Sequence, residues 1–252
     1  MCLGRTHVLG GVAGGFAVAD AYSALVRHLP LTVSLACAAV AGGAALLNDL
    51  DTPSSTASHS LGRLSQGAAR GVQWLAQAAF EVTATPADAR YGSPVHRGLT
   101  HTGVAAVAVG AGAWQLARLG WGVTLAVALL TTFLALRALT SQRGVGSVAA
   151  ALLGGGAVTL AAPTPAIVGL AVAAGLLSHD VLDGCTTMGV PFWWPLRIRG
   201  MRWRRVGLPR FLRFHTGARA EAWFAVLVSA AGVVLLPPVL AVTVSLAHVY
   251  LR

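Results

Sequence analysis

One short stretch of the chain combines a histidine and an aspartate at a spacing that suits metal binding. In Ser178-His179-Asp180-Val181-Leu182-Asp183, His179 and Asp183 stand four residues apart. On a helix these two lie on one face, one turn apart, so both can reach one cation. The stretch ends the apolar run from Ala166 to Leu177, where ionisable residues are costly unless they serve a purpose. The alternative is a helix end at which the aspartate reaches water and the histidine is satisfied by hydrogen bonds.

Three other segments carry the same kinds of side chain next to apolar runs. His7 begins one run, Asn48-Asp49-Leu50-Asp51 ends another, and His96-Arg97-Gly98-Leu99-Thr100-His101 begins a third. Histidine and carboxylate ligands suit zinc first, with manganese or iron(II) as alternatives, and are typical of hydrolytic sites that use a metal-bound water. Taken singly, each segment has an ordinary explanation as a polar membrane-surface residue, a turn or a helix start.

The predicted metal ligands are His7, Asp49, Asp51, His96, His101, His179 and Asp183. In a regular helix His96 and His101 would lie about 140° apart. Both can face one cation only if the site wraps the helix end or His96 precedes the helix, so His101 ranks ahead of His96. Two residues have candidate catalytic roles: Asp51 as a general base, and Arg97, whose guanidinium suits a phosphate or phosphoryl transition state. The alternative for Arg97 is a membrane-surface anchor.

The composition indicates that these segments belong to an integral membrane protein. Of the 252 residues, 56% are hydrophobic and only 10% are charged, with a mean hydropathy of +0.70. A soluble domain has about 25% charged residues. The 30 glycines suit closely packed membrane helices. The three cysteines have no paired spacing, which argues against a disulfide framework and a cysteine-based zinc site.

Eight apolar segments can position the polar residues, although several are short for a bilayer core that needs about 20 residues. They run from about His7 to Val26, Leu31 to Leu47, Leu99 to Ala117, Val123 to Ala138, Val145 to Ala161, Ala166 to Leu182, Ala222 to Leu236, and Val239 to Leu251. Leu61 to Phe80 is amphipathic and is expected to lie at the membrane interface. We predict one domain over residues 1–252: an all-α, polytopic membrane bundle of about six to eight membrane segments plus this interfacial helix. The last two segments could instead form a half-buried hairpin.

If the eight apolar segments cross the membrane in alternating directions, every predicted ligand lies on the same side of the membrane. The same alternation leaves only Arg27 and Arg118 on the far side, so sixteen of the eighteen arginines share the side of the ligands. Under the positive-inside rule this side is the cytoplasm. We therefore expect a multi-pass protein with a metal site that faces the cytoplasm.

The ordered set of motifs resembles the YdjM family of inner-membrane proteins, which are predicted metal-dependent hydrolases. The set consists of His7, Asp49-Leu50-Asp51-Thr52-Pro53, the motif from His96 to His101, the motif from Ser178 to Asp183 with Thr186 after it, and Gly189-Val190-Pro191-Phe192-Trp193-Trp194-Pro195. The resemblance covers roughly His7 to Glu221. Asn48 departs from it, because the family usually has a proline there. The resemblance implies an inner-membrane location and leaves the substrate open.

The order of the motifs is also distantly similar to the zinc phospholipase C and single-strand nuclease superfamily. Those enzymes cleave phosphodiesters at a multi-zinc site, so the similarity implies phospholipase-like chemistry. The later His-x-x-x-Glu pair of that superfamily is not present as such, since His215 and Glu221 lie six residues apart. These two residues are therefore kept only as additional candidate ligands.

The stretch from Arg197 to Arg213 combines arginine with tryptophan, which indicates contact with anionic lipid headgroups. Nucleic-acid binding is the less favoured interpretation.

The expected function is a membrane-bound metal-dependent hydrolase that cleaves a phosphoester of a lipid or lipid-linked substrate. The rival is a non-catalytic metal-binding membrane protein, such as an ion transporter or a structural factor. A transporter would carry ionisable residues near the bilayer midplane, and apart from Asp20 the predicted spans lack them.

Overall fold

The computed structural model describes residues 3–90, 96–140, 145–161, 163–232 and 234, and these residues form helices and no β-strand. The helices are α1 (Gly4–Leu25), α2 (Leu31–Ala44), α3 (Arg63–Thr83), α4 (Pro86–Ala89), α5 (Gly103–Ala117), α6 (Trp121–Leu139), α7 (Val145–Leu160) and α8 (Pro165–Gly184). Three short 3-10 turns are η1 (Asn48–Asp51), η2 (Leu99–His101) and η3 (Arg210–Leu212). Residues 219–232 are also helical. The predicted all-α class is confirmed.

Within the described residues, four helical stretches are long and apolar enough to cross a membrane: Gly4–Leu25, Leu31–Asp51, Trp121–Leu139 and Pro165–Gly184. Two further apolar helices, Gly103–Ala117 and Ala150–Leu160, are shorter. The structure is therefore that of a helical membrane bundle. The expected segment from Val239 to Leu251 lies outside the described residues, so the number of crossings stays a prediction.

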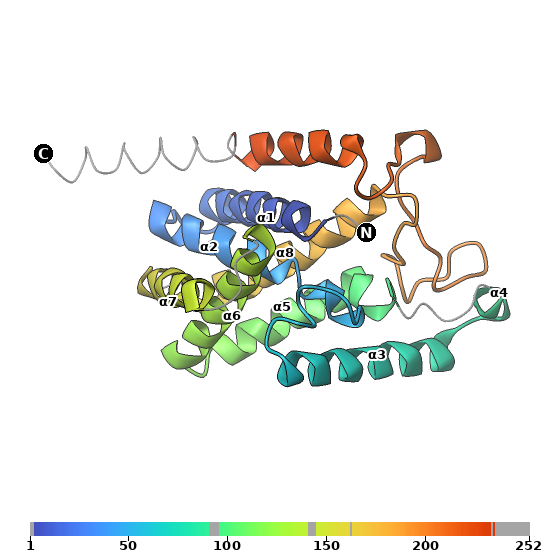
Figure 1. Ribbon diagram of the computed structural model, residues 1–252, viewed down its shortest axis with the longest axis horizontal. Helices are drawn as coiled ribbons and strands as arrows, with labels where there is room; N and C mark the ends of the chain where they lie inside the picture. Colours follow the sequence, from blue (N-terminus) through green and yellow to red (C-terminus); the bar gives the residue numbers. More distant parts are fainter. Residues whose placement is uncertain (1–2, 91–95, 141–144, 162, 233, 235–252) are drawn as a thin grey trace, which may run out of the picture.

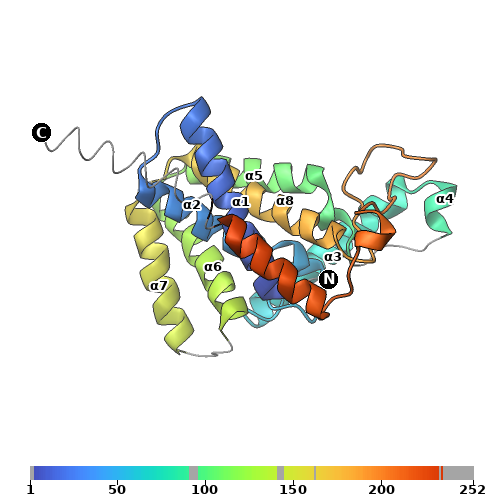
Figure 2. The ribbon, with the colours of Figure 1, turned by 90° about the horizontal axis from the view of Figure 1, so that it is seen from above.

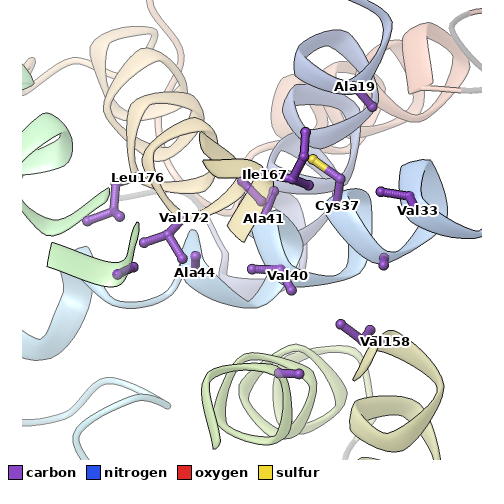
Figure 3. Packing of buried hydrophobic residues seen from close by; sticks show 14 of the residues in the cluster. Ala19, Val33, Cys37, Val40, Ala41, Ala44, Val158, Ile167, Val172 and Leu176 are labelled. Carbon is purple, nitrogen blue, oxygen red and sulfur yellow. The ribbon is translucent and has the colours of Figure 1, made fainter. Parts of the chain in front are cut away.

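Helix α2 lies at the centre of the bundle, in contact with α1, α6, α7 and α8. Helix α5 packs along α8, and α6 pairs with α7 (Figures 1 and 2). Helix α3 runs along one side of the molecule, away from the bundle core, where it contacts η1 and η2 (Figure 1). The core of the bundle is built from small and β-branched side chains, such as Ala41, Val172 and Ile167 (Figure 3).

Glycines let the backbones of the central helices approach closely. A Cβ atom at Gly11 of α1 would lie 2.4 Å from the carbonyl oxygen of Ala41, and one at Gly175 of α8 would lie 2.3 Å from the same atom. No side chain fits at such distances, so both helices can pack on α2 only because these residues are glycine. This packing brings the start of α1 and the end of α8 to the same end of the bundle (Figure 1).

Helix α3 confirms the predicted amphipathic helix, although it runs three residues further than the expected end at Phe80. It buries Ser65, Ala69, Ala76 and Phe80 against the protein. Its apolar side chains on another face are exposed: Leu64 is 79% and Val82 is 84% accessible. An exposed apolar face of this kind is what a helix at a membrane interface requires.

Candidate metal centre

Four segments that are far apart in the sequence meet at the end of the bundle where the N-terminus lies (Figure 1). They are the first turn of α1, the turn η1, the segment from His96 to His101, and the last turns of α8. Their ionisable side chains are almost all excluded from solvent: His7, Asp49, Asp51, His101, His179 and Asp183. His96 lies at the edge of this cluster, with 28% of its side chain exposed.

Ligand atoms from η2 and α8 approach to distances that a shared cation requires. Nε2 of His101 lies 3.2 Å from Nε2 of His179, and each lies 3.7 Å from Oδ2 of Asp183. Two ligand atoms of a tetrahedral zinc ion, each about 2.0–2.1 Å from the metal, stand about 3.3 Å apart. The three atoms therefore surround a position that a cation could take.

His7 and Asp49 complete the cluster. The ring of His7 stacks on that of His179, with centroids 3.6 Å apart, and Nε2 of His7 lies 3.5 Å from Oδ1 of Asp183. Oδ1 of Asp49 lies 3.7 Å from Nε2 of His179. Two groups of three residues in the described part of the chain could each hold a cation: His7 with His179 and Asp183, and Asp49 with His96 and His101.

Hydrogen bonds on the outer ring nitrogens prepare two imidazoles to bind metal through Nε2. Nδ1 of His179 lies 2.6 Å from the carbonyl oxygen of Ala45, so Nδ1 carries a proton and Nε2 is the nitrogen left to bind a cation. Nδ1 of His101 lies 3.3 Å from Oδ2 of Asp51. Burial lowers the pKa of His101 against the opposing effect of Asp51, which keeps this ring in the neutral form that metals bind.

The carboxylate of Asp51 contacts the Nδ1 atoms of His96 and His101 and does not point into the centre of the cluster. Its Oδ1 is 3.0 Å from Nδ1 of His96, and its Oδ2 faces Nδ1 of His101. Oδ2 also accepts hydrogen bonds from the backbone N–H of Arg97 and the hydroxyl of Thr100. The sequence predicted Asp51 as a ligand and general base. With both oxygens engaged, the geometry favours a positioning role for this carboxylate.

His96 and His101 both precede α5, which begins only at Gly103. Thr102 ends the preceding turn, and its hydroxyl caps the helix by accepting a hydrogen bond from the N–H of Ala105. The rings of the two histidines are perpendicular, with centroids 5.4 Å apart. From the sequence, both could approach one cation only if the site wrapped the helix end or His96 preceded the helix, and the structure meets the second condition.

Arg97 is fully buried and contacts the end of α8. Its Nε lies 2.8 Å from Oδ2 of Asp183, and its Nη1 donates to the hydroxyl of Thr186 at 2.7 Å. The residue has a φ of 57°, an unusual value outside glycine. From the sequence, the guanidinium of Arg97 suited a phosphate or phosphoryl transition state, with a membrane-surface anchor as the alternative. In the structure, this guanidinium lies against the aspartate of the His-x-x-x-Asp motif, where its charge balances that carboxylate.

The cluster fits a divalent cation in both hydrogen bonding and charge. In the described part of the chain, both ring nitrogens of His7 and Oδ1 of Asp49 are buried without a hydrogen-bond partner. Such atoms are costly to bury. Four carboxylic side chains are buried in this part of the protein, Asp49, Asp51, Asp180 and Asp183, together with a single buried guanidinium among the described residues, that of Arg97. Nitrogen and carboxylate donors together suit zinc, then manganese or iron(II).

Asn48 and Asp180 connect η1 to α8 beside this cluster. Nδ2 of Asn48 donates to Oδ1 of Asp180 at 2.8 Å and to the carbonyl oxygen of Leu176. This contact fixes the turn that carries Asp49. Sequence reasoning did not find it, because a turn after a helix can point its side chains in several directions.

Glu221 and His215, the additional candidate ligands, lie outside both groups that could hold a cation. The carboxylate of Glu221 accepts hydrogen bonds from the backbone N–H of Leu3 and the hydroxyl of Thr6, and is buried. It therefore caps the start of α1, the helix that carries His7. His215 is exposed.

Part of the stretch from Arg197 to Arg213 packs into the protein. Trp203 is 6% exposed and lies against Phe80, and its backbone N–H donates to Oδ1 of Asp88. Burial alone would raise the pKa of Asp88, but hydrogen bonds from Thr85 and from this stretch outweigh it and lower the pKa. Trp203 therefore holds this segment to α3 and α4, whereas most of the neighbouring arginines are exposed.

Comparison with known proteins places the chain in a family. Among curated proteins and solved structures, none matches the chain. The model of the YdjM inner membrane protein family matches residues 1–251. Because this match covers almost the whole chain, the protein belongs to the YdjM inner membrane protein family.

Proposed function

We propose that this protein is a membrane-bound, metal-dependent hydrolase that cleaves a phosphoester of a lipid or lipid-linked substrate at a site facing the cytoplasm. The observation that carries the proposal is the buried meeting of His101, His179 and Asp183, whose ligand atoms lie 3.2–3.7 Å apart. Family membership supports an inner-membrane location. Zinc is the first candidate for the cation.

The cation would be held by the imidazoles of His7, His101 and His179 and the carboxylates of Asp49 and Asp183. When bound, it would supply an activated water and polarise the phosphoryl oxygen. Arg97 would hold Asp183 in place through their ion pair, and Ala45 would keep His179 in the right tautomer through its carbonyl oxygen.

His96 is the group of the cluster that a substrate could reach. Its side chain is partly exposed, and its Nδ1 lies 3.0 Å from Oδ1 of Asp51. A histidine oriented by a carboxylate is a common general acid or base. We therefore assign proton transfer to His96, with Asp51 as its positioning partner. His96→Gln should then retain metal and lose most turnover, whereas metal loss in this variant would make His96 a ligand.

The position of the cluster supports a lipid as substrate. The cluster lies at the ends of apolar helices, next to α3 with its exposed apolar face. The exposed arginines from Arg197 to Arg213 suit anionic headgroups at the same surface. A nucleic acid would also meet these arginines, but it would not use the apolar face.

The test is hydrolysis by purified protein in mixed micelles, using a panel of phosphatidic acid, phospholipids, lipid pyrophosphates and nucleotides. Zinc-loaded wild-type protein should release phosphate or headgroup from one lipid substrate. Chelation and His101→Ala should abolish this release. His28→Ala, an exposed histidine remote from the cluster, is the matched control and should keep full activity. A protein that binds metal but turns over no member of the panel would favour the non-catalytic alternative.

A further inference from the structure

A second polar site lies beside the cluster, on the side of α3. A cavity of about 280 Å³ opens between α3 and the segment from Pro53 to His59. Its polar lining is formed by Ser58, His59, Gln66, Arg70 and Gln73. None of these belongs to the groups that could hold a cation.

The charge of this cavity favours an anion. Among the residues that the structure describes, no acidic side chain lines it. Among the described residues Arg70 forms no ion pair, and the acidic residue of its own helix, Glu81, is eleven residues and about 16 Å further along the axis. The carboxylate of Asp51, on the neighbouring turn, is directed at His96 and His101. The guanidinium is therefore available to a ligand.

One turn of chain joins this cavity to the metal centre. The side-chain amide of Gln73 donates to the backbone carbonyl oxygen of Asp51 at 2.9 Å. The next residue, Thr52, places its hydroxyl 2.6 Å from Nδ1 of His96, and Pro53 then forms part of the cavity wall. A ligand in the cavity would therefore be adjacent to the partly exposed edge of the cluster.

The orientation of α3 sets the depth of the cavity relative to a membrane. Leu64 and Leu75 share the exposed apolar face of the helix. Arg70 lies about 120–140° around the helix from both, as 100° per residue requires. When the apolar face rests on the bilayer, Arg70 and the cavity lie at the level of the headgroups.

We propose that this cavity is a subsite for a phosphate group of an anionic lipid headgroup, bound by the guanidinium of Arg70 and the amide of Gln66. Arginine binds phosphate oxygens in a two-bond fork, which a glutamine side chain can supplement as a donor. The subsite rests on the proposed function, because it would hold the headgroup of the lipid whose phosphoester meets the cluster. Its affinity for phosphate does not depend on turnover.

Binding can be measured on chelator-treated, full-length protein in phosphatidylcholine nanodiscs, so that phosphate cannot bind a metal. Isothermal titration calorimetry with dioctanoyl phosphatidic acid measures the affinity of each protein. The affinity should fall at least about tenfold in Arg70→Gln, because this variant loses a charge-assisted hydrogen bond to the phosphate. Arg63→Gln, an exposed arginine on the same helix that does not line the cavity, should stay within twofold of wild type. Equal affinities in all three proteins would overturn the proposal.

Inorganic phosphate separates headgroup recognition from simple membrane attachment. Phosphate should compete with dioctanoyl phosphatidic acid in the wild type, since the subsite recognises the phosphate group. An absence of competition would assign the affinity to acyl chains and overturn the proposal. Failure of the hydrolase proposal would look different: metal-loaded wild type would turn over no lipid while the Arg70 dependence of binding persisted.

Discussion

Replacing Asp51 by asparagine separates a positioning role from a ligand role for this carboxylate. Asp51 holds the outer nitrogens of His96 and His101 at 3.0 and 3.3 Å. Asparagine has almost the same shape but only one acceptor oxygen. Its NH₂ group would face one imidazole N–H, and two donors cannot form a hydrogen bond. One of the two histidines should therefore lose its fixed orientation.

Loss of an outer hydrogen-bond partner typically lowers metal affinity 10–100-fold, or by about 1.4–2.8 kcal/mol. Asp51→Asn should fall in this range, because the ligand atoms of His101, His179 and Asp183 themselves remain. His179→Ala removes a ligand atom and should cost more. Asp20→Asn, about 20 Å further along α1 from His7, is the matched control and should cost nothing.

The assay is competitive zinc titration of detergent-purified protein against a chromophoric chelator, with circular dichroism to show that each variant is folded. An unchanged affinity in Asp51→Asn would show that this carboxylate does not orient the histidines. An affinity loss as large as that of His179→Ala would show that Asp51 binds the cation directly, as the sequence predicted.

Three further outcomes are expected. Glu221→Gln should lower stability by about 1–2 kcal/mol in thermal unfolding, because the start of α1 loses a negative charge, and an unchanged melting temperature would exclude this cap. Because the pKa of Asp88 is lower in the folded protein than in the unfolded chain, the ionised carboxylate stabilises the fold. This stabilisation is complete above about pH 4 and is lost as the pH falls through the pKa of Asp88 in the folded state. Acid titration of Trp203 fluorescence should show this loss in wild type but not in Asp88→Asn, and identical curves would contradict it. If the metal centre faces the cytoplasm, Arg199→Cys in a background without native cysteines should resist impermeant thiol reagents in intact cells, and efficient labelling would reverse the topology.

Helical periodicity made the main ligand pair predictable. Four-residue spacing fixes His179 and Asp183 on one face of a helix, whatever surrounds it, and their ligand atoms lie 3.7 Å apart in the structure. Alternation of apolar segments also predicted that the start of α1 and the end of α8 would share one end of the bundle. Both features follow from local physics and chain connectivity, which a sequence displays directly.

Contacts between distant segments were not predictable in the same way. The roles of Arg97 and Glu221 depend on partners 86 and 215 residues away, respectively, and no spacing rule selects such partners. The orientation of Asp51 depends on η1 and η2, two short turns that only tertiary contacts hold in place. Sequence reasoning therefore found the residues of the cluster but could not separate ligands from the groups that orient them.

Measuring the metal content of purified protein shows directly whether this buried cluster is a metal centre. Purified wild-type protein, loaded with zinc and then desalted, should retain at least one cation per chain by elemental analysis. Asp183→Ala and His179→Ala should each lose bound metal while remaining folded in the membrane. Asp180→Asn should retain it, because Asp180 contacts Asn48 and lies outside the two ligand groups. Wild-type protein without metal, or full metal content in Asp183→Ala, would show that the cluster is not the metal centre described above.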